Sequence, residues 1–402
     1  MSRPAQCENE PGLAQEAALG AGRLIRRYSP LFVLIAFAVS ACRTAPAVSP
    51  ASPSEPAGGP PLLPDPGPSA SRPLDPAFAR AKPDANGWIR FLVDLREQVD
   101  LHRLMADHDR RALPRSARRS EPLLALSTVA ERGRSRLEPL LERLVSSGEI
   151  DYYRALRFRN RFFVSARPGM VERLRAEAAV AELIPEYDSV REARAEAGRG
   201  ISMSPPIPPG DSWGVASLGL RDLWRAGIDG RGAVIGILDT GVLGGHLALE
   251  PARRGSPDWY DPASGSPDPI DTEPHGSLVL GCALGRDVDG HALGAAPGAR
   301  WVAALSNLYN SYNNVNMSLA ADWLLFEARP DVLLCAWGHG KAVCDPRDRD
   351  MVEAFRASGV LAVFAAGNYG PDAGSGESPA DLDGYYPPGG GPLSVAAVDR
   401  LG

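Results

Sequence analysis

Ile237-Leu238-Asp239-Thr240-Gly241-Val242 is the most informative segment of this chain. It continues an apolar run over residues 233–238, which follows Gly232 and has the length of a strand. Unbroken apolarity of this kind is typical of a parallel strand that is buried on both faces of its sheet. Asp239 then stands at the carboxyl end of the strand, where open α/β sheets place their active sites. The segment therefore predicts an α/β fold with a functional carboxylate at residue 239.

Two further segments come later in the chain, His275-Gly276-Ser277 and Phe364-Ala365-Ala366-Gly367-Asn368. His275 opens a helical pattern over residues 275–281, so its ring projects from a fixed backbone. A serine hydroxyl is a poor nucleophile unless an imidazole takes its proton, and the imidazole needs a buried carboxylate to hold its tautomer. Each segment alone is weak evidence, because aspartic proteases also carry Asp-Thr-Gly. Those enzymes would need a second Asp-Thr/Ser-Gly, and the sequence has none.

Together the segments resemble the aspartate, histidine and oxyanion-asparagine segments of subtilisin-like serine proteases (subtilases, peptidase family S8), in particular members similar to bacillopeptidase F. The resemblance implies that Asp239 orients His275 and that His275 acts as the general base. It implies that Asn368 donates its side-chain amide to the oxyanion. It also implies a subtilisin-like three-layer fold with a mostly parallel sheet over residues 211–402.

Residues 331–338 resemble the strand that walls the substrate cleft of this family. Ala336, Trp337 and Gly338 are therefore expected to bind a protein or peptide substrate through their backbone groups. The family usually has Asn or Ser at the positions of Cys335 and Ala336. The exchange predicts a more apolar rim of the substrate pocket.

The nucleophile of the family lies in a Gly-Thr-Ser segment at a helix start, and no such segment occurs among the 402 residues. Ser394, the last serine, sits inside an apolar run without a tight turn or helix start, and we reject it as a substitute. We therefore expect a sequence truncated before the catalytic serine, with an incomplete sheet and no peptidase activity as given. The alternative is a pseudoprotease that binds peptides or a partner in the cell envelope without cutting them.

Residues 87–190 predict a separate α+β domain with the order β-α-β-β-α-β. Strand-like segments cover residues 88–95, 152–158, 161–166 and 181–184, with a polar helix from Leu101 and an amphipathic helix over residues 122–145. The order resembles the ferredoxin-like inhibitory propeptide of subtilases, which implies that this domain is a partner of the protease domain. A generic ferredoxin-like domain is the alternative. The Gly- and Pro-rich residues 191–210 read as a linker before the peptidase domain at 211–402.

The N-terminus has the pattern of an export signal over residues 1–42. Arginines precede a short apolar run, and Val39-Ser40-Ala41 stands before Cys42 as in a bacterial lipobox. By that resemblance Cys42 is lipidated and anchors an exported envelope protein to a membrane; a plain secretory signal is the alternative. Residues 43–86, rich in Pro, Ala and Ser, read as a tether, so that ordered structure is expected to begin near Trp88.

Composition excludes several other classes of function. The net charge of −6 and the lack of a long basic run argue against a nucleic-acid partner. Five scattered cysteines without a CxxC pair predict no zinc or redox site, although a disulfide between Cys335 and Cys344 stays an alternative. No metal ligand or cofactor site can be identified, and calcium is implied only by the family resemblance.

Overall fold

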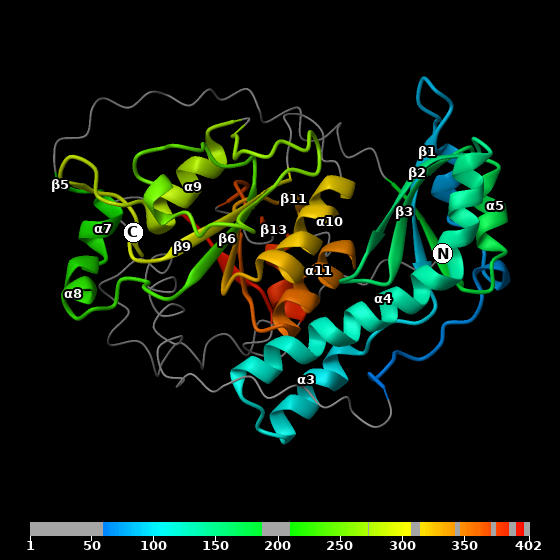
Figure 1. Ribbon diagram of the computed structural model, residues 1–402, viewed down its shortest axis with the longest axis horizontal. Helices are drawn as coiled ribbons and strands as arrows, with labels where there is room; N and C mark the ends of the chain where they lie inside the picture. Colours follow the sequence, from blue (N-terminus) through cyan, green and yellow to red (C-terminus); the bar gives the residue numbers. More distant parts are fainter. Residues whose placement is uncertain are drawn as a thin grey trace. The chain divides into compact units, whose positions relative to one another are not determined.

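The computed structural model describes residues 59–186, 210–271, 273–306, 314–341, 346–370, 375–385 and 391–397 (Figure 1). The chain divides into two compact units. The smaller unit contains residues 59–186, and the larger one contains most of the described residues from 210 onward. Among the described residues, no helix combines the length and the apolarity that a membrane crossing requires.

The smaller unit is built on a sheet with the strand order β2-β3-β1-β4, in which all neighbours are antiparallel. Apolar side chains from one face of the sheet, such as Phe91 and Val164, form a core with Leu141 and Leu174 of two helices. The predicted order of elements is therefore present. In chain order the elements are β1 (Ile89–Leu95), α3 (Leu101–Arg110), α4 (Arg115–Ser146), β2 (Ile150–Leu156), β3 (Arg161–Ala166), α5 (Met170–Arg175) and β4 (Val180–Pro185).

Ordered structure begins earlier than the sequence suggested. Residues 59–86 include two 3-10 turns, η3 (Ser69–Ser71) and η4 (Pro76–Arg80), and the ring of Phe78 meets that of Phe91 at 5.7 Å between centroids. Leu74 also packs against the core of the sheet. The expectation that order starts near Trp88 is wrong for this part, because two apolar side chains among the prolines bury enough surface to hold the segment on the sheet.

A parallel sheet with the strand order β14-β12-β10-β6-β9-β7 forms the centre of the larger unit (Figure 1). Because side chains alternate along a strand, Ile235 and Ile237 of β6 face a core that contains Leu280 of α9. Gly236 faces the other way, toward Leu324 and Pro330, which follow α10. Helices thus lie on both faces of the sheet, as the predicted three-layer α/β fold requires. The six strands are β6 (Val234–Asp239), β7 (Trp259–Tyr260), β9 (Arg300–Leu305), β10 (Val332–Cys335), β12 (Leu361–Ala365) and β14 (Leu393–Val395).

Shorter elements complete the larger unit. The two-residue strand β5 (Gly210–Asp211) pairs with β8 (His291–Ala292), and β11 (His339–Lys341) pairs with β13 (Glu377–Ser378). The remaining helical segments are α7 (Trp213–Ser217), α8 (Leu220–Arg225), η5 (Glu250–Ala252), α9 (His275–Leu284), α10 (Asn314–Trp323), the π-helical turn η6 (Leu324–Ala328), α11 (Pro346–Ala357) and η7 (Ala380–Tyr385).

Candidate active site

Three neighbouring parallel strands end at the same edge of the larger sheet. β10 lies between β6 and β12, with Leu334 opposite Ile237 on one side and Cys335 opposite Phe364 on the other. Asp239 therefore lies close to the segments that continue β10 and β12, which are residues 336–338 and 366–368. The topology brings the predicted carboxylate, substrate-binding and oxyanion segments to the carboxyl edge, where ligands bind in such sheets.

Asp239 and His275 form a hydrogen-bonded pair. His275 Nδ1 lies 2.7 Å from Asp239 Oδ1, and that oxygen also accepts the N–H of Thr240 at 2.7 Å. Asp239 is buried with 1% of its surface exposed, whereas 48% of the His275 side chain is exposed. In the neutral imidazole, a carboxylate beside Nδ1 favours the proton on Nδ1, so that Nε2 is the nitrogen able to accept a proton.

The pair makes His275 a stronger base. The hydrogen bond to Asp239 raises the pKa of His275 above its ordinary value; burial acts in the opposite direction, and the charges of Asp239, Asp271 and Glu273 add to the rise. Because the folded-state pKa is raised, the charged pair stabilises the fold fully below the ordinary histidine pKa. That stabilisation is lost as the pH rises through the raised value.

A network around Thr240 fixes the start of α9 against the end of β6. The N–H of Gly276 donates to Thr240 Oγ1 at 2.9 Å, and Thr240 Oγ1 lies 2.7 Å from both Asp271 Oδ1 and the carbonyl oxygen of Glu273. Asp271 Oδ2 accepts the N–H of Ser277 at 2.8 Å. These bonds position the His275 backbone. The role of Asp271 was missed in the sequence, because no periodic pattern surrounds this residue.

Glycine is required where α9 meets β6. A Cβ atom on Gly276 would lie 2.1 Å from the carbonyl oxygen of Gly241 and 3.2 Å from Asp239 Cβ. Gly241 has φ +114°, and a Cβ there would lie 2.0 Å from the carbonyl oxygen of Ile270. The backbones at residues 276 and 241 therefore lie so close to their neighbours that only glycine, which has no Cβ atom, fits at either position.

Replacing Gly276 by alanine is expected to push α9 away from β6 and to destabilise the fold by about 1–3 kcal/mol. Thermal unfolding of the chain, followed by near-UV circular dichroism, measures the loss. Gly281→Ala in the same helix is the matched control, because no atom lies within 4 Å of a Cβ built there. Equal unfolding temperatures for the two variants would contradict the close approach of the two backbones.

The predicted substrate-binding segment continues β10. Trp337 is buried, donates its indole N–H to the carbonyl oxygen of Leu238 at 2.8 Å and meets the ring of Phe364 edge-on at 5.5 Å. The Trp337 side chain thus connects the ends of β6 and β12. Because that side chain is buried, only the Trp337 backbone could contact a substrate. Cys335 is a free, buried thiol with 1% of its surface exposed. The expectation that Cys335 contributes to an apolar pocket rim is wrong, because its side chain points into the core.

Asn368 lies just beyond the end of β12 and is exposed. Its backbone N–H donates to Oε1 of Glu377 at 2.9 Å, a contact that the sequence did not suggest. Asn368 follows β12, so it lies at the same sheet edge as Asp239. Its role in catalysis stays a prediction.

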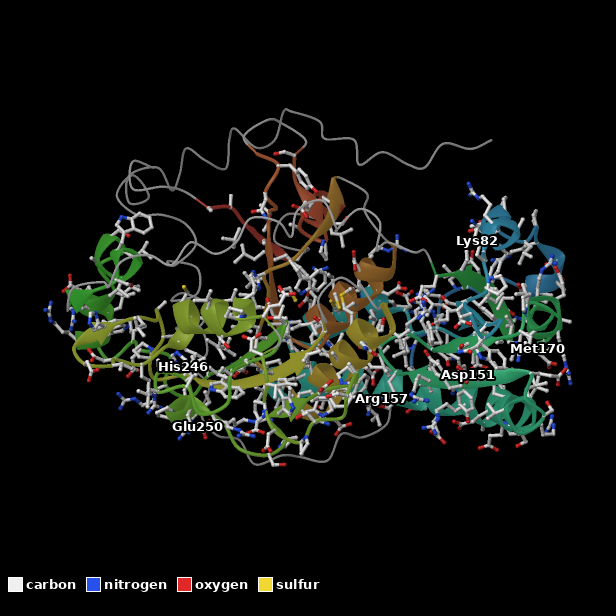
Figure 2. The ribbon with its side chains drawn as sticks, turned by 90° about the horizontal axis from the view of Figure 1, so that it is seen from above. Lys82, Asp151, Arg157, Met170, His246 and Glu250 are labelled. Carbon is white, nitrogen blue, oxygen red and sulfur yellow. The ribbon has the colours of Figure 1, made fainter. Side chains whose placement is uncertain are left out.

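His246 is the histidine that precedes His275 in the chain. It lies on an exposed turn close to Glu250 (Figure 2). His246 Nδ1 accepts the N–H of Ala248 at 3.2 Å, and the carbonyl oxygen of His246 accepts the N–H of Glu250 at 2.8 Å. Cys42 and Cys344 lie outside the described residues. Within those residues no group of three or more His, Cys, Asp or Glu side chains gathers as a metal-binding cluster.

Comparison with known proteins identifies the family of one segment of the chain. Residues 230–400 match the subtilase family (peptidase S8). This segment belongs to the subtilase family. The matched segment contains Asp239, His275, residues 336–338 and Asn368.

Two relatives from Bacillus subtilis (strain 168) are similar to parts of the chain. Bacillopeptidase F is 34% identical over 181 residues, which cover 40% of this chain and 13% of that protein. The major intracellular serine protease is 27% identical over 164 residues, which cover 39% of this chain and 49% of that protein. The chain thus spans less than half the length of either relative.

Proposed function

We propose that the subtilase domain is the aspartate- and histidine-bearing part of an endopeptidase that hydrolyses peptide bonds in proteins. The observation that carries the proposal is the 2.7 Å contact between His275 Nδ1 and Asp239 Oδ1 at a helix start. In the proposed reaction His275 Nε2 takes the proton of a serine hydroxyl as its oxygen attacks the substrate carbonyl carbon. His275 then donates that proton to the leaving amine, while Asp239 stabilises the imidazolium.

The sheet edge supplies the remaining parts of the reaction. The substrate backbone pairs with residues 336–338, and the Asn368 amide donates to the developing oxyanion. Ser394 lies in the middle of β14, not at a helix start, so it does not serve as the nucleophile. We propose that the nucleophilic serine belongs to a longer product of the same coding region.

The test compares the 402-residue chain with that longer product on casein. We expect no hydrolysis by the shorter chain and hydrolysis by a product that contains a Gly-Thr-Ser segment. Casein turnover by the shorter chain that disappears in His275→Ala would overturn the assignment of a missing nucleophile. A serine-bearing product that is folded yet inactive would overturn the endopeptidase proposal.

A second candidate is peptide binding without cleavage, which is supported by the position of residues 336–338 and 366–368 after two adjacent parallel strands, β10 and β12. Both candidates predict that the 402-residue chain binds peptides. Sequencing the source genome beyond codon 402 separates them. A stop codon succeeded by unrelated sequence would favour the binding protein, and a Gly-Thr-Ser segment in any frame would favour the endopeptidase.

We also propose that residues 87–190 act as the inhibitory propeptide of this peptidase, supported by their β-α-β-β-α-β order. Cleavage would fall in the linker at 191–210. A chain without a nucleophile cannot make this cut, so no species starting near Asp211 should appear in a protease-free host. The appearance of that species would show that the chain cuts itself.

Export as a lipoprotein anchored through Cys42 is proposed from the sequence pattern alone. Metabolic labelling with a radioactive fatty acid should mark the wild-type protein and not Cys42→Ser. Equal labelling of the two would point to another anchor, and no labelling of either would favour the plain secretory signal. Calcium binding is implied by family likeness, and no step of the proposed reaction depends on it.

A further inference from the structure

Four exposed apolar side chains of the larger unit come from segments that lie next to one another. Among the described residues, nine large apolar side chains are exposed, and four of these are Leu243, Leu247, Ile270 and Leu278. Between 37% and 75% of each of the four residues is exposed. Single exposed apolar residues are ordinary on a protein surface, but several at one place are typical of a binding surface. We call these four residues the apolar strip.

Hydrogen bonds join the segments that carry the apolar strip. The N–H of Leu243 donates to Ser277 Oγ at 2.8 Å, which brings the Leu243 backbone to the turn of α9 that carries Leu278. The N–H of Val242 donates to the carbonyl oxygen of Ile270 at 3.0 Å. The strip therefore lies on backbone segments that the larger unit holds together.

The apolar strip begins beside the proposed catalytic base. His275 and Leu278 are three residues apart in α9, so they share one face of the helix and lie about 5 Å apart along its axis. Both residues are exposed, whereas Gly276 and Leu280 of the same helix are buried and face the side of β6 (Figure 1). A chain that contacts the His275 ring is thus within one or two residues of Leu278, because an extended chain advances about 3.3 Å per residue.

We infer that the apolar strip binds the part of a peptide substrate that follows the scissile bond, and that it favours apolar side chains there. The inference rests on the proposed function, in which His275 donates a proton to the leaving amine, so that the leaving peptide begins at the imidazole. In that function the acyl part lies along residues 336–338 and 366–368, which follow β10 and β12. Because β6 lies on the other side of β10 from β12, the leaving part continues toward the segment after β6, which carries Leu243.

Peptide binding to the 402-residue chain, which is expected not to cut the peptides, tests the preference. Fluorescently labelled dodecapeptides carry three consecutive leucines or three serines, either in the N-terminal or in the C-terminal half, and anisotropy gives each Kd. Leucines in the C-terminal half should tighten binding about tenfold or more over serines there, since burial of leucine side chains favours the complex. The double variant Leu243→Ser, Leu278→Ser should lose this preference and keep any preference in the N-terminal half. Leu124→Ser, at an exposed leucine of α4, is the matched control and should keep both.

Photo-cross-linking tests the position of the bound peptide independently of any variant. A dodecapeptide with p-benzoylphenylalanine in its C-terminal half is irradiated with the wild-type chain, and mass spectrometry identifies the residues that react. We expect cross-links to residues 242–247, 270 and 277–278. With the probe in the N-terminal half, the cross-links should fall outside these residues.

The outcomes separate this inference from the proposed function. No binding of any peptide by the folded chain would overturn the proposed cleft, and the inference with it. Peptide binding without a leucine preference in the C-terminal half, or cross-links from that half to other residues, would overturn the inference and leave the cleft intact. If the double variant does not fold, the cross-links in the wild-type chain decide. A dimer in sedimentation velocity that disappears in the folded double variant would assign the apolar strip to a second copy of the chain and so contradict the inference.

Discussion

Replacing His275 by alanine in the proposed serine-bearing endopeptidase is expected to lower kcat for peptide hydrolysis by about 10⁶-fold, the scale measured for the equivalent change in subtilisin. The loss is expected because the imidazole is the base that removes the serine proton, and its Nδ1 is already held by Asp239 at 2.7 Å. Asp239→Asn should cost less, about 10⁴-fold, since the imidazole remains but its tautomer and charge are no longer supported. Steady-state kinetics on a fluorogenic peptide measures both.

The double variant supplies the control for this prediction. Because the pair acts as a unit, His275→Ala combined with Asp239→Asn should be about as slow as His275→Ala alone. Multiplicative losses in the double variant, or retention of more than a tenth of the activity in His275→Ala, would show that the pair is not the catalytic base.

Replacing Arg161 by methionine is expected to destabilise the smaller unit by about 3–5 kcal/mol. Arg161 and Asp94 are each 4% exposed, and Arg161 donates from Nε to Oδ1 at 2.6 Å and from Nη2 to Oδ2 at 2.9 Å. The variant leaves Asp94 buried with only the longer contact to Arg159, at 3.3 Å. Hydrogen–deuterium exchange of peptides from β1 and β3 measures the free energy of opening in this unit.

Arg110→Met is the matched control in the same unit. Arg110 pairs with Asp107 on the surface, with 66% and 39% of the two side chains exposed, so its loss should cost less than about 1 kcal/mol. Similar exchange rates in Arg161→Met and Arg110→Met would show that the buried pair stabilises the unit no more than the surface pair does.

The buried pair of Asp94 and Arg161 also makes the stability of the smaller unit fall at acid pH. Burial acts to raise the pKa of Asp94, but the charges of Arg161 and Arg159 and their hydrogen bonds outweigh it and lower the pKa. Because the folded-state pKa is depressed, this stabilisation is present above the ordinary aspartate pKa and is lost as the pH falls through the lowered value.

The sequence was most informative where local pattern and chain order coincide. The apolar run before Asp239 predicted β6, and His275 is the first residue of α9, as expected from the helical pattern after it. In the smaller unit, β3 has the predicted bounds, while α4 begins at Arg115 instead of residue 122. Residues 115–121 are mostly charged and polar, so they carried no apolar periodicity.

Contacts between distant segments were not predictable from the same patterns. Glu377 reaches Asn368 because the segments around them are joined by hydrogen bonds, and strands as short as β11 and β13 leave no alternation to detect. Asp271 reaches Ser277 through a loop whose path depends on Gly241. Cys335 was placed at the pocket rim by likeness to a family position, but the direction of a side chain at a strand end depends on the register of the sheet.

Nuclear magnetic resonance of the chain labelled with ¹⁵N-histidine tests the central claim, that Asp239 holds His275 as a catalytic base. The six histidines can be separated by assigning His275 through its loss in His275→Gln. We predict a His275 pKa above the ordinary histidine value and a strongly downfield Nδ1 proton, both of which return toward ordinary values in Asp239→Asn. A His275 that titrates at or below the ordinary value in the wild-type chain, or that is unchanged by Asp239→Asn, would contradict this claim.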